Sequence, residues 1–307
     1  MTVKRTAVFA CDNNYAGYLA TTIASLIDNF ESSLQLEIII FDAGIKNNSK
    51  DSLLKLSTDN ISIHFFPIEE QIFSDFPLTI SHISLATYFR LKLPSLLNKH
   101  DKVVYLDVDV LINKDISDMW NIDLQGHSLG AVIEPRMSFT QYDYLEKIGL
   151  TEKKHLYFNA GVLIMDLNCL RDINFEEKVA NYLFQYKDVI EYQDQDILNG
   201  VLQGNVHYIS PKYNFMPEYR TILKPNRIWM LDKLPYTKSE IESLRSNANI
   251  YHYCGKRRAW MYSCTHDGAD LYIKYQNSTD WVGDGYSDLR ELSIFKKLSL
   301  WAKKRFY

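Results

Sequence analysis

Two aspartates, Asp107 and Asp109, stand in the run YLDVDVLI, whose other residues are typical of a buried strand. Charged side chains are rarely buried unless they are paired or bind a metal. If residues 102–112 form one strand, both carboxylates lie on the same face, because successive side chains of a strand point to opposite faces. Such carboxylates repel each other unless a cation lies between them, and their oxygens suit magnesium or manganese beside phosphate oxygens. The alternative is a strand end where both aspartates cap turns, and the short pattern leaves both interpretations open.

A second group of chemically useful side chains lies in HYCGKRRAW, residues 252–260. As a neutral imidazole, His252 can bind a metal. Gly255 allows the backbone to approach a phosphate closely, and the three consecutive cations that follow it suit a diphosphate. The alternative is a solvated basic turn, which is what most short runs of charge form.

A third group is Asp194, Gln195 and Asp196 in YQDQDILNG, directly before an apolar stretch of helical spacing. An aspartate at a helix start accepts hydrogen bonds from backbone N–H groups that have no partner in the helix. One aspartate is enough for this capping. The additional polar side chains therefore indicate a role beyond starting the helix.

The elements that must position these groups alternate between strand-like and helix-like patterns. The expected strands are residues 6–11, 36–42, 61–68 and 102–112, and the expected helices are residues 16–30, 49–57 and 84–97, the last disturbed by Pro94. This alternation predicts an α/β fold whose parallel sheet is covered on both faces. Ligands of such sheets bind at the carboxyl ends of the strands, which is where Asp12 and the two aspartates of DVD stand.

The alternation is looser in the second half of the chain. Further strands are expected in LGAVIEP, FNAGVLIMDL and VHYIS, and a helix is expected in FEEKVANYLFQY. The sequence shows no internal repeat and no Gly/Ser-rich linker. We therefore expect one catalytic domain over residues 1–265 and a differently built tail over residues 266–307.

Composition narrows the class of protein. The 307 residues carry a formal net charge of -4, which argues against nucleic-acid binding. The four cysteines form no CxxC pair, so their spacing does not predict a zinc site. The apolar run at the N-terminus is too short for a signal peptide, and no stretch is long enough to span a membrane. We expect a cytoplasmic protein with reduced thiols.

Seven motifs recur in the same order in a known family. FACDNNY, ISLATYFRLKL, YLDVDVLIN, YFNAGVLIMDL, YQDQDILNG, YNFMP and HYCG, spread over residues 5–265, resemble the retaining glycosyltransferases of family 8. Within that family, the likeness is greatest to the bacterial α-1,4-galactosyltransferases of lipooligosaccharide synthesis. The resemblance implies a Rossmann-like nucleotide-sugar transferase fold of type A. It also implies transfer of a hexose, galactose in the first place, from UDP to a lipooligosaccharide or lipopolysaccharide acceptor.

The resemblance also implies roles for single residues. Manganese, with magnesium as an alternative, would bind to Asp107, Asp109 and His252. Asp12 and Asn14 would contact the uridine nucleotide, and Asp107, Gly255 and Arg258 would contact the diphosphate. The donor sugar would be contacted by Arg90, Asn159, Asp194 and Gln195. His82 and Glu134 would contact the acceptor. Along the expected acceptor groove the chain departs from the family galactosyltransferase at Ser81, Glu134, Arg136 and Glu218. The identity of the acceptor is therefore less well predicted than the chemistry.

The reaction expected from this resemblance retains the configuration of the transferred sugar. A double displacement needs a nucleophile on the face opposite the leaving group. Gln195 is a poor nucleophile, and Asp194 is the nearby carboxylate that the sequence offers. Attack on the same face, with the leaving phosphate accepting the proton of the acceptor, needs no protein nucleophile, and we favour it. Alternatives are a glucosyltransferase of the same family, a nucleotidyltransferase, which also uses paired aspartates and a metal, and a catalytically silent UDP-sugar-binding membrane protein.

The last residues of the chain, LSIFKKLSLWAKKRFY, combine an apolar stripe of helical spacing with five cations and no acid. A basic amphipathic helix of this kind predicts contact with an anionic membrane surface, where each basic residue contributes about 1 kcal/mol. The alternative is a terminal helix docked on the core of the protein itself. With a glycolipid acceptor, we expect a peripheral protein on the inner face of the cell membrane.

Overall fold

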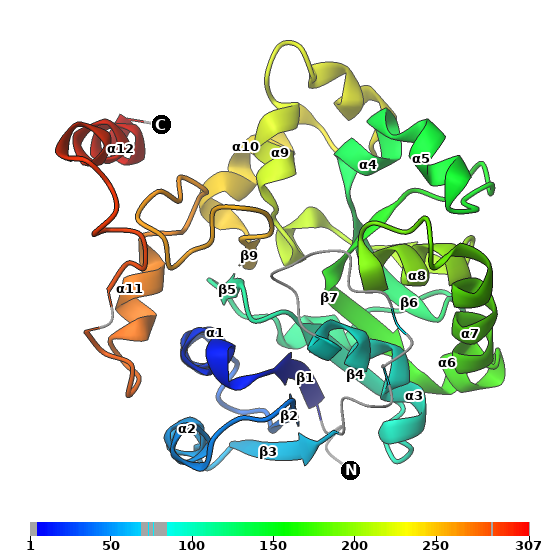
Figure 1. The fold of residues 1–307 in the computed structure, drawn as a ribbon, viewed down its shortest axis with the longest axis horizontal. Helices are drawn as coiled ribbons and strands as arrows, with labels where there is room; N and C mark the ends of the chain where they lie inside the picture. The colour runs from blue at the N-terminus through cyan, green and yellow to red at the C-terminus, as the bar shows by residue number, and fades with distance from the viewer. Residues whose placement is uncertain (1–4, 69–72, 74–75, 77–84, 284, 307) are drawn as a thin grey trace.

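The computed structural model describes residues 5–68, 73, 76, 85–283 and 285–306. Its centre is a sheet of seven strands in the order β3-β2-β1-β4-β7-β6-β8 (Figure 1). The strands are β1 Arg5–Cys11, β2 Leu36–Asp42, β3 Ile61–Pro67, β4 Lys102–Leu106, β6 Leu129–Ile133, β7 Phe158–Asp166 and β8 Val206–Tyr208. The expected α/β fold is confirmed, and β7 has the place that FNAGVLIMDL predicts.

The direction of β7 differs from the wholly parallel sheet that the sequence predicts. β1, β2, β3 and β4 are parallel, whereas β7 runs antiparallel to both of its neighbours, β4 and β6. Because β7 is antiparallel, it begins where β4 ends. The backbone N–H of Asp107, directly after β4, donates to the carbonyl oxygen of Gly161 near the start of β7 at 2.8 Å. The turn after β4, which contains Asp107, therefore meets the start of β7, which contains Gly161, at the carboxyl end of β4.

The prediction of a single strand over residues 102–112 is wrong. β4 ends at Leu106, and β5 Val110–Ile112 leaves the main sheet to pair with β9 Ile250–His252 in a second, two-stranded sheet. Asp107 and Asp109 therefore lie in the turn between the strands rather than on one strand face. In this second sheet Val110 pairs with His252, so the histidine of HYCG arrives beside the DVD turn.

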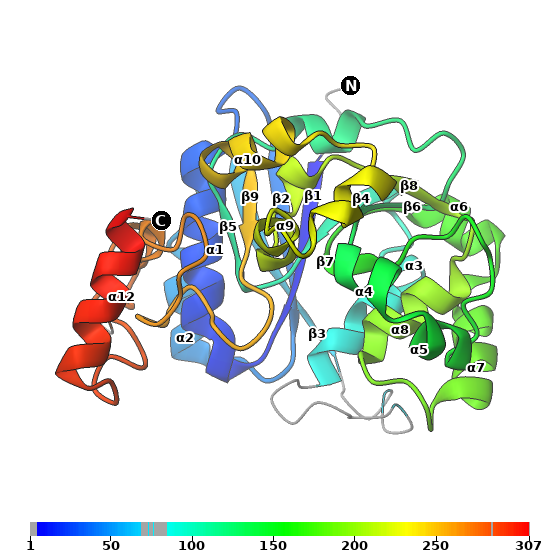
Figure 2. The same cartoon turned by 90° about the horizontal axis from the view of Figure 1, so that it is seen from above.

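Helices cover both faces of the main sheet (Figure 2). Ala7 and Phe9 of β1 point to the core that includes α1, whereas Val8 between them points to the core that includes α6, α7 and α8. This alternation is the period of a strand whose two faces are both buried. The helices are α1 Ala16–Asn29, α2 Asn47–Leu54, α3 Leu93–Leu96, α4 Pro135–Thr140, α5 Tyr142–Lys147, α6 Leu167–Asp172, α7 Phe175–Tyr186, α8 Gln193–Val201, α9 Pro217–Ile222, α10 Lys238–Asn247, α11 Leu271–Gln276 and α12 Ile294–Phe306.

The helix expected over residues 84–97 is divided in the described part of the chain. A 3₁₀ helix over Leu85–Lys92 is followed by the single turn of α3, where Pro94 is in the first turn. A proline fits there because the first turn of a helix leaves its N–H groups without intrahelical partners. Pro94 therefore begins a short helix instead of ending a long one.

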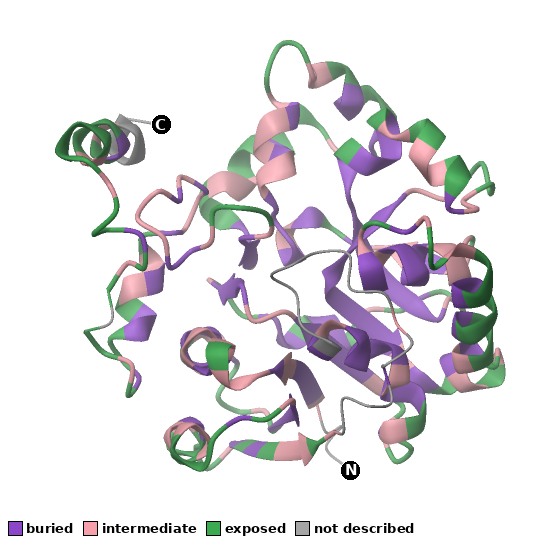
Figure 3. Cartoon of the chain, viewed as in Figure 1, coloured by how far each residue is buried: buried purple, intermediate pink, exposed green. Residues whose placement is uncertain are grey.

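The segment after residue 265 has two different parts. α11 packs on α1, where the Tyr275 hydroxyl contacts Asp28 at 3.1 Å. α12 lies at the edge of the molecule, and Figure 3 shows most of its described surface as exposed. Among the described residues, no helix combines the length and the apolar character needed to cross a membrane. The division of the chain at residue 265 stays a prediction.

Candidate active site

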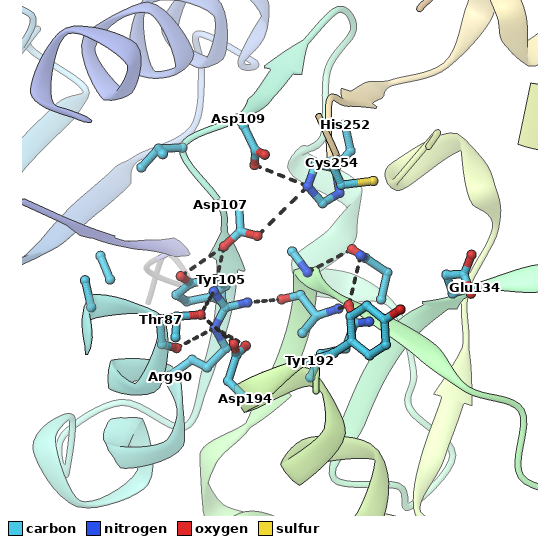
Figure 4. A pocket seen from close by; sticks show the side chains of 18 of the residues that line it. Thr87, Arg90, Tyr105, Asp107, Asp109, Glu134, Tyr192, Asp194, His252 and Cys254 are labelled. Carbon is cyan, nitrogen blue, oxygen red and sulfur yellow. Dashed lines mark hydrogen bonds and ion pairs between the residues drawn. The ribbon is translucent and has the colours of Figure 1, made fainter. Parts of the chain in front are cut away.

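A cleft of about 400 Å³ opens at the carboxyl ends of β1 and β4. It is lined by all the predicted site residues of the described chain except Asn14: Asp12, Arg90, Asp107, Asp109, Glu134, Asn159, Asp194, Gln195, His252, Gly255 and Arg258. Asn14 is exposed and donates its backbone N–H to Asp12. His82, predicted on the acceptor side, lies outside the described residues. Figure 4 shows the cleft from close by.

Asp107, Asp109 and His252 form a cluster whose ligand atoms lie within 4.8 Å of one another. His252 Nε2 is 3.2 Å from Asp109 Oδ1 and 3.9 Å from Asp107 Oδ2. Burial lowers the pKa of His252, although the nearby Asp107 carboxylate opposes this, so the imidazole is kept neutral as a metal ligand must be. Two carboxylates and one neutral imidazole are a donor set that fits manganese or a similar divalent cation.

The space beside this cluster exists because residue 161 has no side chain. A Cβ at Gly161 would lie 2.3 Å from His252 Cε1 and 2.7 Å from Asp107 Oδ2. Both distances are far below van der Waals contact. Gly161 therefore permits the histidine and the aspartate to approach each other against the backbone of β7.

Arg90 connects the metal cluster to the start of α8. Its guanidinium is 4% exposed, lies 2.7 Å from Asp107 Oδ1 and 3.1 Å from Asp194 Oδ2, and donates to the carbonyl oxygen of Ala160. It also stacks over the ring of Tyr105 at 4.1 Å. A buried cation between two carboxylates keeps both of them in fixed positions.

The three polar residues at the start of α8, Asp194, Gln195 and Asp196, have different hydrogen-bond partners. Asp196 accepts hydrogen bonds from the backbone N–H groups of residues 191 and 192 and from the Tyr157 hydroxyl, so this aspartate holds the helix start. Asp194 instead accepts from the Thr87 hydroxyl and pairs with Arg90. Burial raises the pKa of Asp194 to about 6, although Arg90 acts against the rise. Asp194 and Gln195 thus line the cleft, whereas Asp196 fixes the segment before the helix; Tyr192 is at the N-cap and makes no side-chain capping bond, so the capping interpretation of the sequence is wrong.

The side of the cleft nearest β1 and β9 is lined by two cations, by Gly255 and by the carboxylate of Asp12. Asp12 accepts from the backbone N–H groups of Asn14 and Tyr15 at 2.9 and 3.1 Å, as a residue capping the short helix that follows. Gly255 has a φ of 99°, a conformation that side chains disfavour. Arg258 pairs with Asp109, and Lys256 lines the same wall. This wall suits an anionic group next to the metal cluster.

The opposite end of the cleft is acidic. Glu134, at the start of α4, and Glu218, in the first turn of α9, line it together with Cys254, whose thiol lies 3.8 Å from Glu218 Oε2. Burial, helped by Glu218, raises the pKa of Glu134 to about 8. Figure 4 shows Glu134 well apart from the Arg90 and Asp107 group, on the other side of Tyr192.

Sequence reasoning missed several residues that shape the cleft. Thr87 and Tyr105 hold Asp194 and Asp107, and Tyr15, Tyr192 and Cys254 line the walls. Gly161 is part of the motif YFNAGVLIMDL, but a glycine inside a strand carries no chemistry that would single it out. A glycine in a strand can mark a close approach of another group, and this was the available signal.

Comparison with known proteins agrees with this geometry. The model of glycosyl transferase family 8 matches residues 6–264. A candidate glycosyltransferase of Haemophilus influenzae is 35% identical over 260 residues, which cover 84% of this chain and 74% of that protein. The lipopolysaccharide 1,2-glucosyltransferase of Escherichia coli is 26% identical over 293 residues, which cover 94% of this chain and 82% of that protein.

A solved structure shows the same fold. The galactosyltransferase LgtC, solved with donor and acceptor sugar analogs, superposes with a TM-score of 0.79 at 33% identity, covering 91% of this chain and 98% of that one. The similarity confirms the nucleotide-sugar transferase fold of type A. Since the family model also spans most of the sequence, the chain belongs to glycosyl transferase family 8.

Proposed function

We propose that this glycosyltransferase moves a hexose, galactose in the first place, from UDP to the saccharide of a lipooligosaccharide or lipopolysaccharide acceptor. Glucose is the second candidate, because one relative is a lipopolysaccharide glucosyltransferase. The observation that carries the proposal is the cluster of Asp107, Asp109 and His252 in the same cleft as the Gly255 wall and the Arg90 network. A metal cluster beside a basic wall is what a sugar diphosphate requires.

In this proposal the donor occupies the charged end of the cleft. Asp107, Asp109 and His252 would hold manganese, which supplies Lewis-acid neutralisation of the diphosphate as it leaves. Arg258 and the backbone at Gly255 would bind the diphosphate oxygens, and Asp12 would contact the uridine nucleotide. Arg90, Asn159, Asp194 and Gln195 would orient the sugar. The acidic end with Glu134 would take the acceptor.

Hydrogen bonding in the cleft supports attack on the same face as the leaving group. Gln195 Oε1 already accepts two hydrogen bonds, from Asn159 Nδ2 and from the Ala160 backbone N–H, both at 3.0 Å. Asp194 is paired with Arg90 and accepts from Thr87. Both lone pairs of Gln195 Oε1 are therefore in use, and the charge of Asp194 is held by Arg90 and Thr87, which makes each group a weak nucleophile for a double displacement. The departing phosphate oxygen would therefore accept the proton of the acceptor hydroxyl.

We also propose that α12 binds an anionic membrane on the cytoplasmic side, near a lipid-linked acceptor. Four apolar side chains of α12 are exposed: Ile294 73%, Phe295 86%, Leu298 59% and Trp301 49%. The chain has five Lys and Arg residues from position 296 onward and no acidic residue there. Exposed apolar side chains beside cations suit the boundary between lipid headgroups and acyl chains. In contrast, Leu300 is 3% exposed, so one position of the helix is covered.

The test of the proposed reaction is release of UDP from candidate donors. The purified chain is incubated with UDP-galactose, UDP-glucose or UDP-N-acetylglucosamine, with manganese or with a chelator, and with a soluble oligosaccharide acceptor. We expect UDP release from a UDP-hexose that needs the metal and is increased by the acceptor. A nucleotidyltransferase would form pyrophosphate from a nucleoside triphosphate instead. A silent binding protein would bind UDP without turnover.

A further inference from the structure

A chain of buried amide side chains connects the metal cluster to Gln195. Asn214, which is fully buried between β8 and α9, lies with its Oδ1 2.8 Å from His252 Nδ1. Its Nδ2 donates to Asn159 Oδ1 at 2.9 Å. Asn159 Nδ2 in turn donates to Gln195 Oε1 at 3.0 Å. Four side chains from separate parts of the sequence therefore form one continuous row of hydrogen bonds.

Two consecutive backbone N–H groups of β7 set the direction of this row. The N–H of Gly161 donates to Asn159 Oδ1 at 2.9 Å, and the N–H of Ala160 donates to Gln195 Oε1 at 3.0 Å. A backbone N–H can only donate, so both side-chain atoms must be oxygens. Asn159 then has its NH₂ group toward Gln195, and Asn214 must have its NH₂ group toward Asn159.

The tautomer of His252 follows from this direction. With its NH₂ group toward Asn159, Asn214 has its oxygen toward His252 Nδ1, so that nitrogen must carry the proton. A neutral imidazole protonated at Nδ1 has its free lone pair on Nε2. Nε2 is the nitrogen that faces Asp107 and Asp109. The amide row therefore directs the metal-binding lone pair of His252 into the cluster.

We propose that Asn214 is a positioning residue with two functions: it fixes the metal-binding tautomer of His252 and, through Asn159, it fixes the orientation of the Gln195 carboxamide. The second function rests on the proposed glycosyl transfer. The first requires only that the cluster binds a divalent metal. An asparagine suits this place because it must accept on one side and donate on the other, which neither aspartate nor an apolar side chain of similar size can do.

Two substitutions at this position separate the two functions. Asn214→Leu removes both hydrogen bonds, and we expect manganese affinity, measured by electron paramagnetic resonance in the presence of UDP, to fall about 10- to 100-fold, as for other residues that orient metal ligands. Asn214→Asp still accepts from His252 Nδ1 but cannot donate to Asn159. We expect it to keep manganese affinity near the wild-type value and to lower kcat for transfer, with little change in the KM for UDP-sugar.

The matched control is Asn205→Leu. Asn205 makes two side-chain hydrogen bonds with Ser128, at 2.8 and 2.9 Å, and does not line the cleft. The control should lose thermal stability and keep wild-type manganese affinity. Wild-type affinity in a folded Asn214→Leu protein would overturn the proposal. Equal losses of affinity in the Leu and Asp variants would also overturn it, because they would make Asn214 a merely structural residue.

A measurement on the unmodified protein covers the case in which Asn214→Leu fails to fold. Nitrogen-15 NMR of histidine-labelled apo protein reports which ring nitrogen of His252 carries the proton, and we expect Nδ1. A proton on Nε2 would contradict the row of hydrogen bonds. Metal affinity and tautomer are both measured without sugar transfer. If the wild-type chain releases no UDP from any UDP-hexose, the proposed reaction fails while the tautomer result still decides the role of Asn214 at the metal.

Discussion

The two ends of the cleft differ in whether their carboxylates are paired with cations. At the end proposed for the donor, carboxylates and cations are paired across elements: Arg90 with Asp107 and Asp194, and Arg258 with Asp109. At the end proposed for the acceptor, Glu134 lies near a second carboxylate, Glu218, and its pKa is raised to about 8 by burial and by that neighbour. Paired charges hold a rigid geometry for a ligand of fixed charge, such as a metal diphosphate. Arg136 acts against the rise in the pKa of Glu134, but burial outweighs it, and a carboxyl group that keeps its proton can hydrogen-bond the hydroxyl groups of a sugar.

The largest expected effect is at the donor end. Asp109→Asn removes a metal-binding carboxylate, so we expect manganese-dependent UDP binding to be lost and transfer to fall by more than about 100-fold, the upper limit for residues that only orient metal ligands. Isothermal titration with UDP and manganese measures the binding, and circular dichroism checks the fold. The control is the exposed Asp123→Asn, which should behave as wild type. Full activity of the Asp109 variant would remove the metal site from the proposal.

Gly161→Ala tests the same end by adding atoms instead of removing charge. The new methyl group would meet His252 and Asp107, so we expect manganese affinity to fall roughly 10- to 100-fold. Gly130→Ala in the neighbouring strand is the matched control, because its methyl group would meet Leu124 and Ile164 in the core. The control should lower the melting temperature and leave metal affinity intact. If both variants lose only stability, the free space at residue 161 has no specific link to the metal.

Glu134→Gln probes the acceptor end. We expect the KM for a saccharide acceptor to rise about 10-fold, which corresponds to loss of one hydrogen bond. Hydrolysis of the donor without acceptor should be unchanged. A drop in donor hydrolysis equal to the drop in transfer would show that the two ends do not act separately.

The same substitution has an expected effect on stability with pH. A carboxyl group whose pKa is raised on folding from 4.5 to about 8 keeps its proton in the folded state while the unfolded chain has lost it. Its contribution to the free energy of unfolding therefore falls as pH rises from 4.5 to 8. Glutamine has no proton to lose, so the melting temperature of Glu134→Gln should exceed that of wild type at pH 8 and match it near pH 4.5. Differential scanning calorimetry at both pH values measures the difference.

The smallest effect on catalysis is expected outside the cleft. Truncation after Leu292 removes α12 and keeps Asp288, which accepts from the backbone N–H groups of Tyr262 and Ser263. Transfer to a soluble acceptor should change less than about twofold, while binding to anionic vesicles should be lost. Binding of the full chain should weaken with salt, because charges are screened over about 8 Å at physiological ionic strength.

The matched control for the truncation is Phe184→Ser. Phe184 is 89% exposed on α7, yet it lies outside the basic helix, so vesicle binding should not change. If the truncated chain unfolds, α12 belongs to the core. If it stays folded and still binds vesicles, the membrane contact lies elsewhere.

Local sequence signals predicted most elements, and long-range pairing explains what they missed. The helix FEEKVANYLFQY is α7 with the same bounds, because its apolar spacing needs no distant partner to be recognised. The break after Leu106 was not predictable, because β5 leaves the sheet to pair with a strand about 140 residues later. A local pattern of apolar residues contains no information about a partner at that distance. Likewise, Glu134 and Glu218 become neighbours only in the folded chain.

The absence of a side chain at residue 161 also provides a criterion for reading related sequences. Within this fold, a family member could retain DVD and the histidine of HYCG and still bind a metal weakly if this strand position carried a side chain. Such a protein would resemble an active enzyme by its metal ligands and yet have low metal affinity. Inspection of a single glycine could therefore separate paralogues of low metal affinity from active ones in a genome before any assay is made.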